Sequence, residues 1–306
     1  MVSLTRNAGP LIVDALHDPK TVEVMCNGDG TVWLEQLGQA MKKIGRLSPA
    51  KAESIIRTVA GFHGKEVTRS KPLLEAEWPL DGSRFAGQLP PVVRAATFAI
   101  RKKAISVYTL DEYVEQGIMT AEQCAAIKRA VRDHKNILVV GGTGSGKTTL
   151  INAVIAEMVK AFSDERVFII EDTGEIQCTA HNFVQYHTTI DVTMTDLLKT
   201  SLRMRPDRIL VGEVRGAEAL DLLDAWNTGH PGGAATLHAN SAPEGLTRLK
   251  SLVSRNKSAP AEIEPLIGEA VHVVVSIART PEKGRRIQEV LRVSGFVEGR
   301  YNTHPL

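Results

Sequence analysis

The stretch ILVVGGTGSGKTTLINAV, which runs from Ile137 to Val154, carries the most specific chemical signal in the chain. Its core, Gly141 to Thr148, matches the pattern G-x-x-x-x-G-K-[ST] in full. Glycines let the backbone turn its N–H groups toward phosphate oxygens, and a following helix directs its positive N-terminus at the same anion. The pattern therefore predicts a loop that binds the phosphates of a nucleoside triphosphate.

The polar residues of this loop have roles that follow from their types. The ammonium group of Lys147 can reach the β and γ phosphates, and the Thr148 hydroxyl can be a ligand of Mg²⁺. We expect the nucleotide to contact the residues from the second glycine of the motif onward, namely Gly142, Thr143, Gly144, Ser145, Gly146, Lys147, Thr148 and Thr149.

Hydrolysis also needs a carboxylate near Mg²⁺ and a group that orients the attacking water. The apolar run in VFIIEDTGE ends in Glu171 and Asp172, and the run in RILVGEVRG ends in Glu213. Ligands of open α/β sheets bind at the carboxyl ends of the strands, so we expect these carboxylates at the phosphate site. Gly212 and Glu213 stand where pumps and helicases usually have an aspartate.

Two histidines lie in the stretch NTGHPGGAATLHANSAPEG, His230 and His238. His238 ends the apolar run AATLH, which would place it at the same sheet edge as the phosphate loop. There it could sense the γ phosphate. A structural role is an equally good interpretation of a single histidine.

A phosphoryl-transfer site gains from positive charge beyond one lysine, because an added arginine can raise the rate by about 10³ to 10⁵. The candidates are Arg203 and Arg205 in SLRMRPD, together with Arg84 and Arg101 in the front part of the chain. The sequence alone does not rank these four.

The elements that must position these residues form two groups. From about residue 120, apolar β-rich runs alternate with helical stretches, which is typical of an α/β fold with a mostly parallel sheet covered on both faces. The first hundred residues are of mixed α and β type. VEVMC and TVWLEQL indicate strands, and SPAKAESIIRTVAGFHG indicates a helix that Ser48 caps. We predict an N-terminal α/β domain over 1–104, a linker over 105–119 and a nucleotide-binding domain over 120–306.

Composition excludes several classes of protein. The 306 residues are 43% hydrophobic and 24% charged, as in ordinary globular proteins, and no apolar run approaches the roughly 20 residues of a membrane span. We expect no signal peptide, and the three cysteines form no CxxC pair, which favours a reduced compartment without a zinc module. The net charge of +2 argues against strong nucleic-acid binding. A modest basic surplus in the first third is compatible with an anionic membrane surface or an acidic partner, and equally with ordinary solvated surface.

Several phrases together resemble the traffic ATPases of type II and type IV secretion, most of all the TrbB-type ATPases of conjugative transfer. They are GGTGSGKTT, IEDTGE, LRMRPDRILVGEVRGAEALDLLDAWNTGH and GHPGGAATLHAN, with DPKTVEVMCNGDGTVWLEQLG and GSRFAGQLPPVVRAATFAIRKK in the front part. Type II secretion ATPases usually carry a four-cysteine zinc element, which this sequence lacks. Pilus retraction ATPases resemble the core but differ in the flanking phrases.

The resemblance implies a RecA-like domain behind a smaller N-terminal domain, assembled into a homohexameric ring. It implies an ATPase that uses ATP and Mg²⁺ at the cytoplasmic face of the bacterial inner membrane, where membrane components of the secretion machine are its partners. By position, Glu171 resembles the residue that activates water and Glu213 the carboxylate on the Mg²⁺ side. Arg84 and Arg101 match N-terminal-domain arginines that approach the nucleotide.

Assignment to another class of protein accounts for fewer of these motifs. A GTPase would need a base-reading motif, and NKSA at 256–259 lacks its aspartate. A small-molecule kinase leaves the histidine stretch unexplained. A RecA-class nucleic-acid motor is the stronger alternative, against which stand the near-neutral charge and the lack of a basic stretch interleaved with aromatic residues. A nucleotide-dependent assembly factor without turnover remains open, as does a type II secretion or type IV pilus ATPase.

Overall fold

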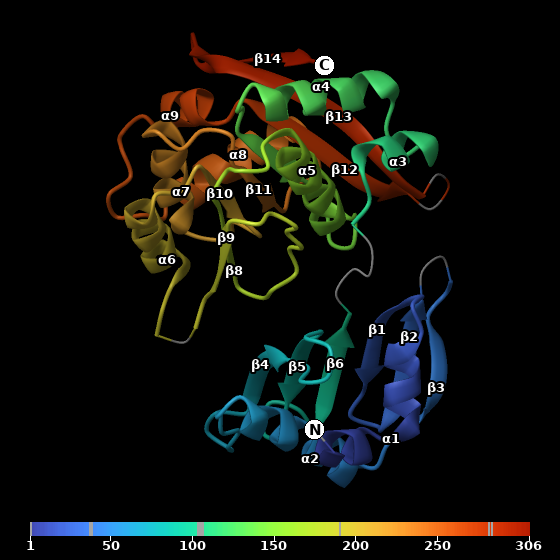
Figure 1. The fold of residues 1–306 in the computed structure, drawn as a ribbon. Helices are drawn as coiled ribbons and strands as arrows, with labels where there is room; N and C mark the ends of the chain where they lie inside the picture. The colour runs from blue at the N-terminus through green and yellow to red at the C-terminus, as the bar shows by residue number, and fades with distance from the viewer. Residues whose placement is uncertain (1, 37–38, 103–106, 190, 281, 283) are drawn as a thin grey trace. The chain divides into compact units, whose positions relative to one another are not determined.

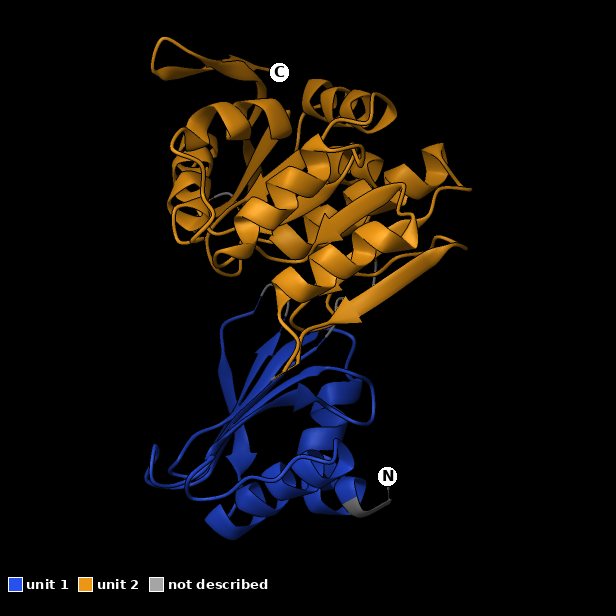
Figure 2. Ribbon diagram, turned by 90° about the vertical axis from the view of Figure 1, so that its left-hand side faces the viewer, with its two compact units in different colours: residues 1–106 blue, residues 107–306 orange. Residues whose placement is uncertain are grey.

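The computed structural model describes residues 2–36, 39–102, 107–189, 191–280, 282 and 284–306. The chain divides into two compact units, Met1–Ser106 and Val107–Leu306, which Figure 2 draws in different colours. Each unit has its own hydrophobic core, so each is described by itself.

Unit 1 is an antiparallel sheet with two helices (Figure 1). The strand order is β3-β2-β1-β6-β5-β4, and every neighbouring pair is antiparallel. The strands are β1 Thr21–Cys26, β2 Thr31–Gln36, β3 Lys42–Arg46, β4 Leu73–Glu77, β5 Arg84–Gln88 and β6 Thr97–Arg101. The helices are α1 Val2–His17, which is kinked at Gly9, and α2 Pro49–Phe62.

The helix predicted in unit 1 begins where its capping residue indicates. The side chain of Ser48 accepts a hydrogen bond from the N–H of Lys51, and Pro49 occupies the first helical turn. The helix buries Ile55, Ile56 and other apolar residues in the core of unit 1, which also holds the inward-facing residues of the strands. Alternate strand residues therefore point away from that core.

Unit 2 contains an eight-stranded sheet with the order β14-β13-β12-β7-β11-β10-β8-β9. Six strands are parallel to one another: β12 Val273–Thr280, β7 Ile137–Val140, β11 Ala234–Leu237, β10 Arg208–Val211, β8 Val167–Glu171 and β9 Phe183–His187. Strands β13 Gly284–Val297 and β14 Arg300–Pro305 extend the sheet in antiparallel fashion. The mostly parallel sheet expected from the sequence is thus present.

Helices cover both faces of this sheet (Figure 1). One core cluster contains residues of α6 Met194–Ser201, α7 Glu218–Asn227, α8 Ala242–Val253 and α9 Ile263–Ala270. The other contains residues of α3 Leu110–Glu115, α4 Ala121–Arg132 and α5 Lys147–Ala161. A short 3-10 helix, η1 Leu202–Met204, precedes β10. The central strands β7, β8, β10 and β11 are buried throughout, which explains their continuous apolar runs.

The prediction of a linker over 105–119 is wrong for its described part. Residues 107–119 belong to unit 2 and contain α3, whose capping box joins Thr109 and Glu112. Leu110, Tyr113 and Met119 are buried in the core beside α4 and α5. The partly buried Tyr108, Val114 and Ile118 pack against the same core. The segment resembles a linker because these apolar residues are interrupted by polar ones and its helix has only six residues. Residues 105–106 lie outside the described residues.

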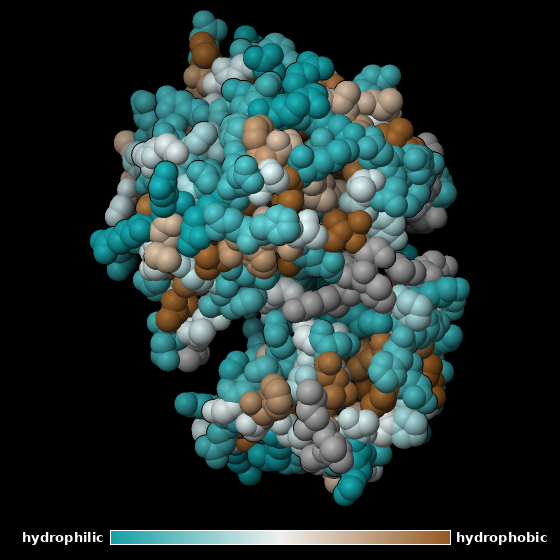
Figure 3. All heavy atoms as spheres, in the orientation of Figure 1, coloured by the Kyte–Doolittle hydropathy of each residue, from teal (hydrophilic) through white to brown (hydrophobic). Residues whose placement is uncertain are grey.

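Among the described residues, no helix is long and apolar enough to cross a membrane. On the face drawn in Figure 3, hydrophilic side chains cover most of the surface of both units, and hydrophobic ones are scattered between them.

Candidate functional site

The phosphate loop connects the buried strand β7 to the long helix α5. Gly144 and Gly146 have φ angles of 69° and 101°, which side chains with a Cβ adopt only under strain. Gly146 is the N-cap of α5, and no side chain caps the first amides of the helix. These amides therefore remain available to an anion, as a phosphate-binding loop requires.

Lys147 lies folded over this loop. Its ammonium group donates hydrogen bonds to the carbonyl oxygens of Gly141 at 3.0 Å and Gly142 at 3.1 Å. It also lies 3.3 Å from Nδ1 of His238, at the end of β11. Because an ammonium group can only donate, this contact requires that Nδ1 accepts and that the ring proton is on Nε2. The loop lysine and His238 thus lie side by side at one edge of the sheet.

His238 connects Lys147 to Glu213. Nε2 of the ring lies 2.6 Å from Oε1 of Glu213, off the line of a direct hydrogen bond. Partial burial and the nearby Lys147 charge lower the pKa of His238, and the Glu213 charge opposes this shift. The ring is therefore mostly neutral at neutral pH.

Glu213 continues the chain of contacts through Arg215. Nε of Arg215 donates to Oε2 of Glu213 at 2.9 Å, and Nη2 contacts the same oxygen. Nη1 of Arg215 donates to Oδ2 of Asp172 at 3.2 Å, at the end of β8. The polar chain from Lys147 to Asp172 therefore follows the strand order β7-β11-β10-β8 along the carboxyl ends of the strands.

The second carboxylate beside the loop is Glu175, which the sequence analysis did not single out. The Thr148 hydroxyl donates to Oε2 of Glu175 at 3.1 Å. Glu175 is half-buried and lies four residues after Glu171 in the same acidic stretch IEDTGE. The stretch IEDTGE contains both glutamates, but Glu171 directly follows the apolar run that predicts the strand, whereas Glu175 lies four residues beyond it.

Glu171 has a different environment from the one expected of a base that activates water. It is 2% exposed, and its Oε1 accepts hydrogen bonds from the backbone N–H groups of Glu175 at 3.0 Å and Ile176 at 2.8 Å. Its Oε2 accepts one from the Gln185 side chain at 2.7 Å. Burial raises the pKa of Glu171, while these hydrogen bonds lower it by a smaller amount. This geometry favours Glu171 as a support for the segment that carries Glu175.

Glu171 also explains why a glycine, Gly212, follows β10. A Cβ atom at Gly212 would lie 2.8 Å from Cγ of Glu171, closer than real Cβ atoms approach other atoms. An aspartate at that position would displace the buried glutamate. The carboxylate of this strand is therefore carried one residue later, by Glu213.

Three of the other candidate residues lie at the opposite ends of the parallel strands, where the strands begin. Arg203 and Arg205 precede β10, and His230 precedes β11, whereas the phosphate loop follows β7. Because these strands are parallel and four residues long, the two edges are about 13 Å apart. His230 contacts the carbonyl oxygen of Pro206 at 3.0 Å instead. None of the three contacts the loop of the same chain.

Arg84 and Arg101 lie in unit 1 and are directly opposite each other on β5 and β6. Glu23 on β1 is opposite Arg101, and Glu77 on β4 is opposite Arg84. Residues opposite each other in an antiparallel pair project from the same face, so the two arginines share one face of the sheet. Both are half-buried.

The side chains present suit Mg²⁺ held together with phosphates. Among the described residues, no group of three or more His, Cys, Asp or Glu side chains could hold a metal ion alone. Mg²⁺ at nucleotide sites is usually bound by one or two protein oxygens, phosphate oxygens and water. Oxygens of this kind come from the Thr148 hydroxyl and from Glu175, which are hydrogen-bonded to each other. Glu213, which follows β10, supplies another.

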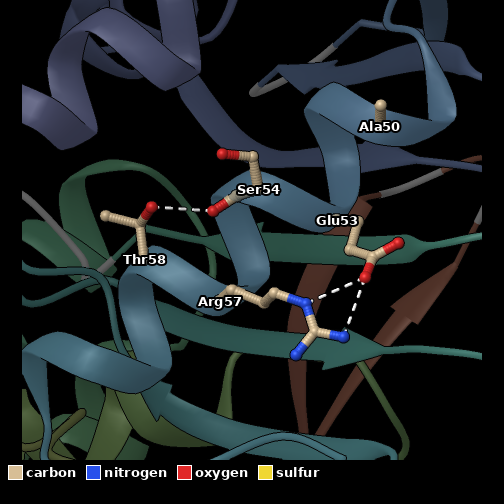
Figure 4. A pocket seen from close by; sticks show the side chains of 5 residues that line it. All are labelled: Ala50, Glu53, Ser54, Arg57 and Thr58. Atoms are coloured by element: carbon tan, nitrogen blue, oxygen red, sulfur yellow. Dashed lines mark hydrogen bonds and ion pairs between the residues drawn. The ribbon is translucent and has the colours of Figure 1, made fainter.

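A surface hollow on α2 in unit 1 shows none of these features (Figure 4). Its lining residues are Ala50, Glu53, Ser54, Arg57 and Thr58. The Arg57 guanidinium donates to Glu53 at 2.8 Å and to the carbonyl oxygen of Val67 at 2.8 Å. Its charge is already paired, so the hollow is a weaker ligand site than the phosphate loop.

Comparisons with known proteins identify the family of the chain. Residues 10–293 match the family described as Type II/IV secretion system protein. The chain is 47% identical over 293 residues to the probable conjugal transfer protein TrbB of Sinorhizobium fredii, covering 96% of this chain and 89% of that protein. It is 46% identical over 300 residues to the conjugal transfer protein TrbB of Rhizobium radiobacter, covering 98% and 92%.

A solved structure extends the likeness to three dimensions. The VirB11 ATPase from the Brucella suis type IV secretion system, in complex with sulphate, is 31% identical to the chain with a TM-score of 0.52. The match covers 95% of this chain and 94% of that one. The predicted resemblance to TrbB-type proteins is thereby confirmed, and the chain belongs to the type II/IV secretion system protein family.

Proposed function

We propose that the chain is a Mg²⁺-dependent ATPase with a RecA-like nucleotide-binding domain, and that it powers conjugative type IV secretion. The observation that carries the proposal is the convergence at one sheet edge of the phosphate loop, the Thr148–Glu175 pair and the chain from Lys147 through His238 to Glu213. Phosphoryl transfer needs a phosphate cradle, a metal site and a group that orients water, and the types of the residues at this edge suit these three tasks.

Each side chain has a role in this proposal. Lys147 stabilises charge on the β and γ phosphates, and His238 beside it senses the γ phosphate. Thr148 and Glu213 serve the metal, which when bound neutralises charge on the phosphates. For the attacking water we prefer Glu175 to Glu171, because Glu171 is buried with both oxygens engaged. Glu171 then positions Glu175.

Arg84 and Arg101 are proposed to complete the nucleotide site from unit 1. Their cross-strand pairing supports this role, because one face of the sheet can present both guanidinium groups together. Two positive charges on the phosphates would add to the single lysine of the loop. Mixing either arginine variant with a Lys147→Ala chain distinguishes action within one chain from action across a subunit boundary.

The assembly and location are proposed from the relatives. The resemblance stated from the sequence implies a homohexameric ring that works with inner-membrane components of a secretion machine, and relatives named for conjugal transfer and type IV secretion are compatible with this role. The ring would lie at the cytoplasmic face of the membrane as a peripheral protein. Its near-neutral charge gives no reason to expect strong direct binding of nucleic acid.

A phosphate-release assay combined with native mass measurement tests this proposal. The purified chain should release phosphate from ATP only when Mg²⁺ is present, and a non-hydrolysable ATP analogue should favour a hexamer. A chain that binds ATP as a monomer and releases no phosphate would instead be a nucleotide-dependent binding protein.

A further inference from the structure

One guanidinium group bridges carboxylates from two neighbouring strands. Arg215 lies four residues after the end of β10, and its Nε and Nη2 both contact Oε2 of Glu213. Its Nη1 donates to Oδ2 of Asp172 at 3.2 Å, in the residue that follows β8. Strands β10 and β8 are adjacent and parallel, so the bridge crosses the edge where both end.

We propose that Arg215 is a positioning residue that holds Glu213 in the orientation in which it serves the metal, and that it ties this orientation to the acidic segment after β8. The inference rests on the proposed function, because it assigns Glu213 to the metal side of that site. Arg215 itself is not proposed to touch the nucleotide.

The two oxygens of Glu213 show why such a residue is needed. Oε1 lies 2.6 Å from Nε2 of His238, off the line of a direct hydrogen bond, and Oε2 is held by Arg215. Without Arg215, Glu213 would keep only the His238 ring, on its other oxygen, among the side chains that the described residues place against it. The Glu213 carboxylate could then rotate, and Asp172 nearby would repel it.

Asp172 links this arrangement to the other proposed catalytic carboxylate. Its Oδ1 accepts a hydrogen bond of 2.9 Å from the Thr188 hydroxyl, while Oδ2 accepts from Arg215. Asp172 and Glu175 are three residues apart in the same short segment. By holding Asp172 and Glu213 together, Arg215 fixes the segment that carries Glu175 relative to the end of β10.

Arginine suits this task better than lysine. The planar guanidinium carries N–H groups on several sides, so one rigid group can meet two carboxylates at once. An ammonium group is a single point on a flexible stem and can follow one carboxylate without fixing the other. The Arg215 side chain is 49% exposed and the Asp172 side chain is 40% exposed, so the bridge adds little to the stability of the fold.

The test compares four variants of the full chain: Arg215→Gln, Arg215→Lys, Asp172→Asn and Arg255→Gln. Arg255 is the matched control, because its Nη1 reaches only the carbonyl oxygen of Arg215 at 3.4 Å and contacts neither carboxylate. The first measurement is Mn²⁺ binding to the protein with a non-hydrolysable ATP analogue, followed by electron paramagnetic resonance. The second is the Mg²⁺ dependence of phosphate release.

Loss of an outer-sphere partner usually weakens metal affinity or activity by about 10- to 100-fold. Arg215→Gln should therefore raise the metal concentration for half-saturation by about 10-fold or more, with little change in metal-free nucleotide binding. Arg215→Lys should recover part of the loss, Asp172→Asn should lose less than Arg215→Gln, and Arg255→Gln should match the wild type.

Two results would overturn the inference. One is a metal dependence of Arg215→Gln within about twofold of the wild type, well below the expected range. The other is an equal loss in Arg255→Gln, which would show that only the backbone segment matters. A wild-type chain that neither binds ATP nor releases phosphate is a separate result, because it would reject the proposed function before any variant is compared.

Discussion

The Thr148 hydroxyl donates a hydrogen bond of 3.1 Å to Oε2 of Glu175, which joins the first turn of α5 to the acidic segment after β8. The backbone N–H of Glu175 is in turn held by Oε1 of Glu171 at 3.0 Å. Glu175 thus lies beside Thr148, a proposed metal ligand, and Glu171 holds the backbone of Glu175 in place.

The first prediction separates these two glutamates. Glu175→Gln keeps the shape of the side chain and removes its ability to accept a proton, so it should bind MgATP but hydrolyse it about 10² to 10⁴ times more slowly. Single-turnover rates and the affinity for a fluorescent ATP analogue measure the two effects separately. Glu171→Gln is the matched variant and should be slowed much less. If Glu171→Gln is the slower of the two, Glu171 is the general base, as the family resemblance of the sequence implies.

The pKa of Glu171 gives a second prediction, about stability. Burial raises this pKa above 4.5, so the folded chain binds the proton more tightly than the unfolded chain does. The stability contributed by Glu171 is fully present below about pH 4.5 and is lost as the pH rises through the folded pKa. Glu171→Gln does not titrate, so its unfolding free energy relative to the wild type should rise as the pH increases from 4.5 through the raised folded pKa of Glu171. Urea unfolding over this range measures the difference, and a flat difference would contradict the assignment.

Gly212 provides a third prediction. A Cβ at this position would lie 2.8 Å from Cγ of Glu171, so Gly212→Ala should lower the unfolding free energy by about 1 to 3 kcal/mol and slow hydrolysis by displacing the acidic segment. Gly61→Ala is the control, because nothing lies within 4 Å of a Cβ there and the residue is inside α2. That change should leave stability equal or raise it by up to about 1 kcal/mol. If both substitutions change the unfolding free energy equally, the Glu171 side chain moves away from the added Cβ at little cost.

Much of this fold could be predicted because its signals are local. A few neighbouring residues are enough to predict the phosphate loop, the Ser48 cap and the buried strands β7, β8 and β10. Strand β9 and helix α3 could not be found in this way, because they have only five and six residues and their apolar residues form no clear strand or helix pattern.

The candidate site shows the same division. Lys147, Thr148, Glu213 and His238 follow strand ends, and the rule that parallel strands end at one edge brings them together. Glu175 and Arg215 lie inside loops, where the direction of a side chain depends on hydrogen bonds such as those of Glu171. Sequence spacing alone does not reveal those bonds.

The fourth prediction concerns the front part of the chain. Arg84→Ala and Arg101→Ala should each leave nucleotide binding largely intact and slow hydrolysis by about 10-fold or more, because they remove charge that stabilises the transferred phosphoryl group. Arg94→Ala, another arginine of unit 1, is the control and should hydrolyse ATP normally. Mixing each variant with the Lys147→Ala chain tests for action across subunits, because restored turnover requires a residue supplied by a neighbour. Normal rates in both arginine variants would make unit 1 a docking domain only.

The measurement that tests the central claim most directly is Mg²⁺-dependent phosphate release from ATP by the full chain and by Lys147→Ala. Lys147 contacts the loop carbonyls and His238 and lies outside the three core clusters, so its removal should leave the thermal unfolding temperature close to that of the wild type. The account predicts hydrolysis by the wild type and a loss of at least about 10²-fold in the variant. Residual activity within about tenfold of the wild type, a barrier change of about 1.4 kcal/mol or less, would contradict it.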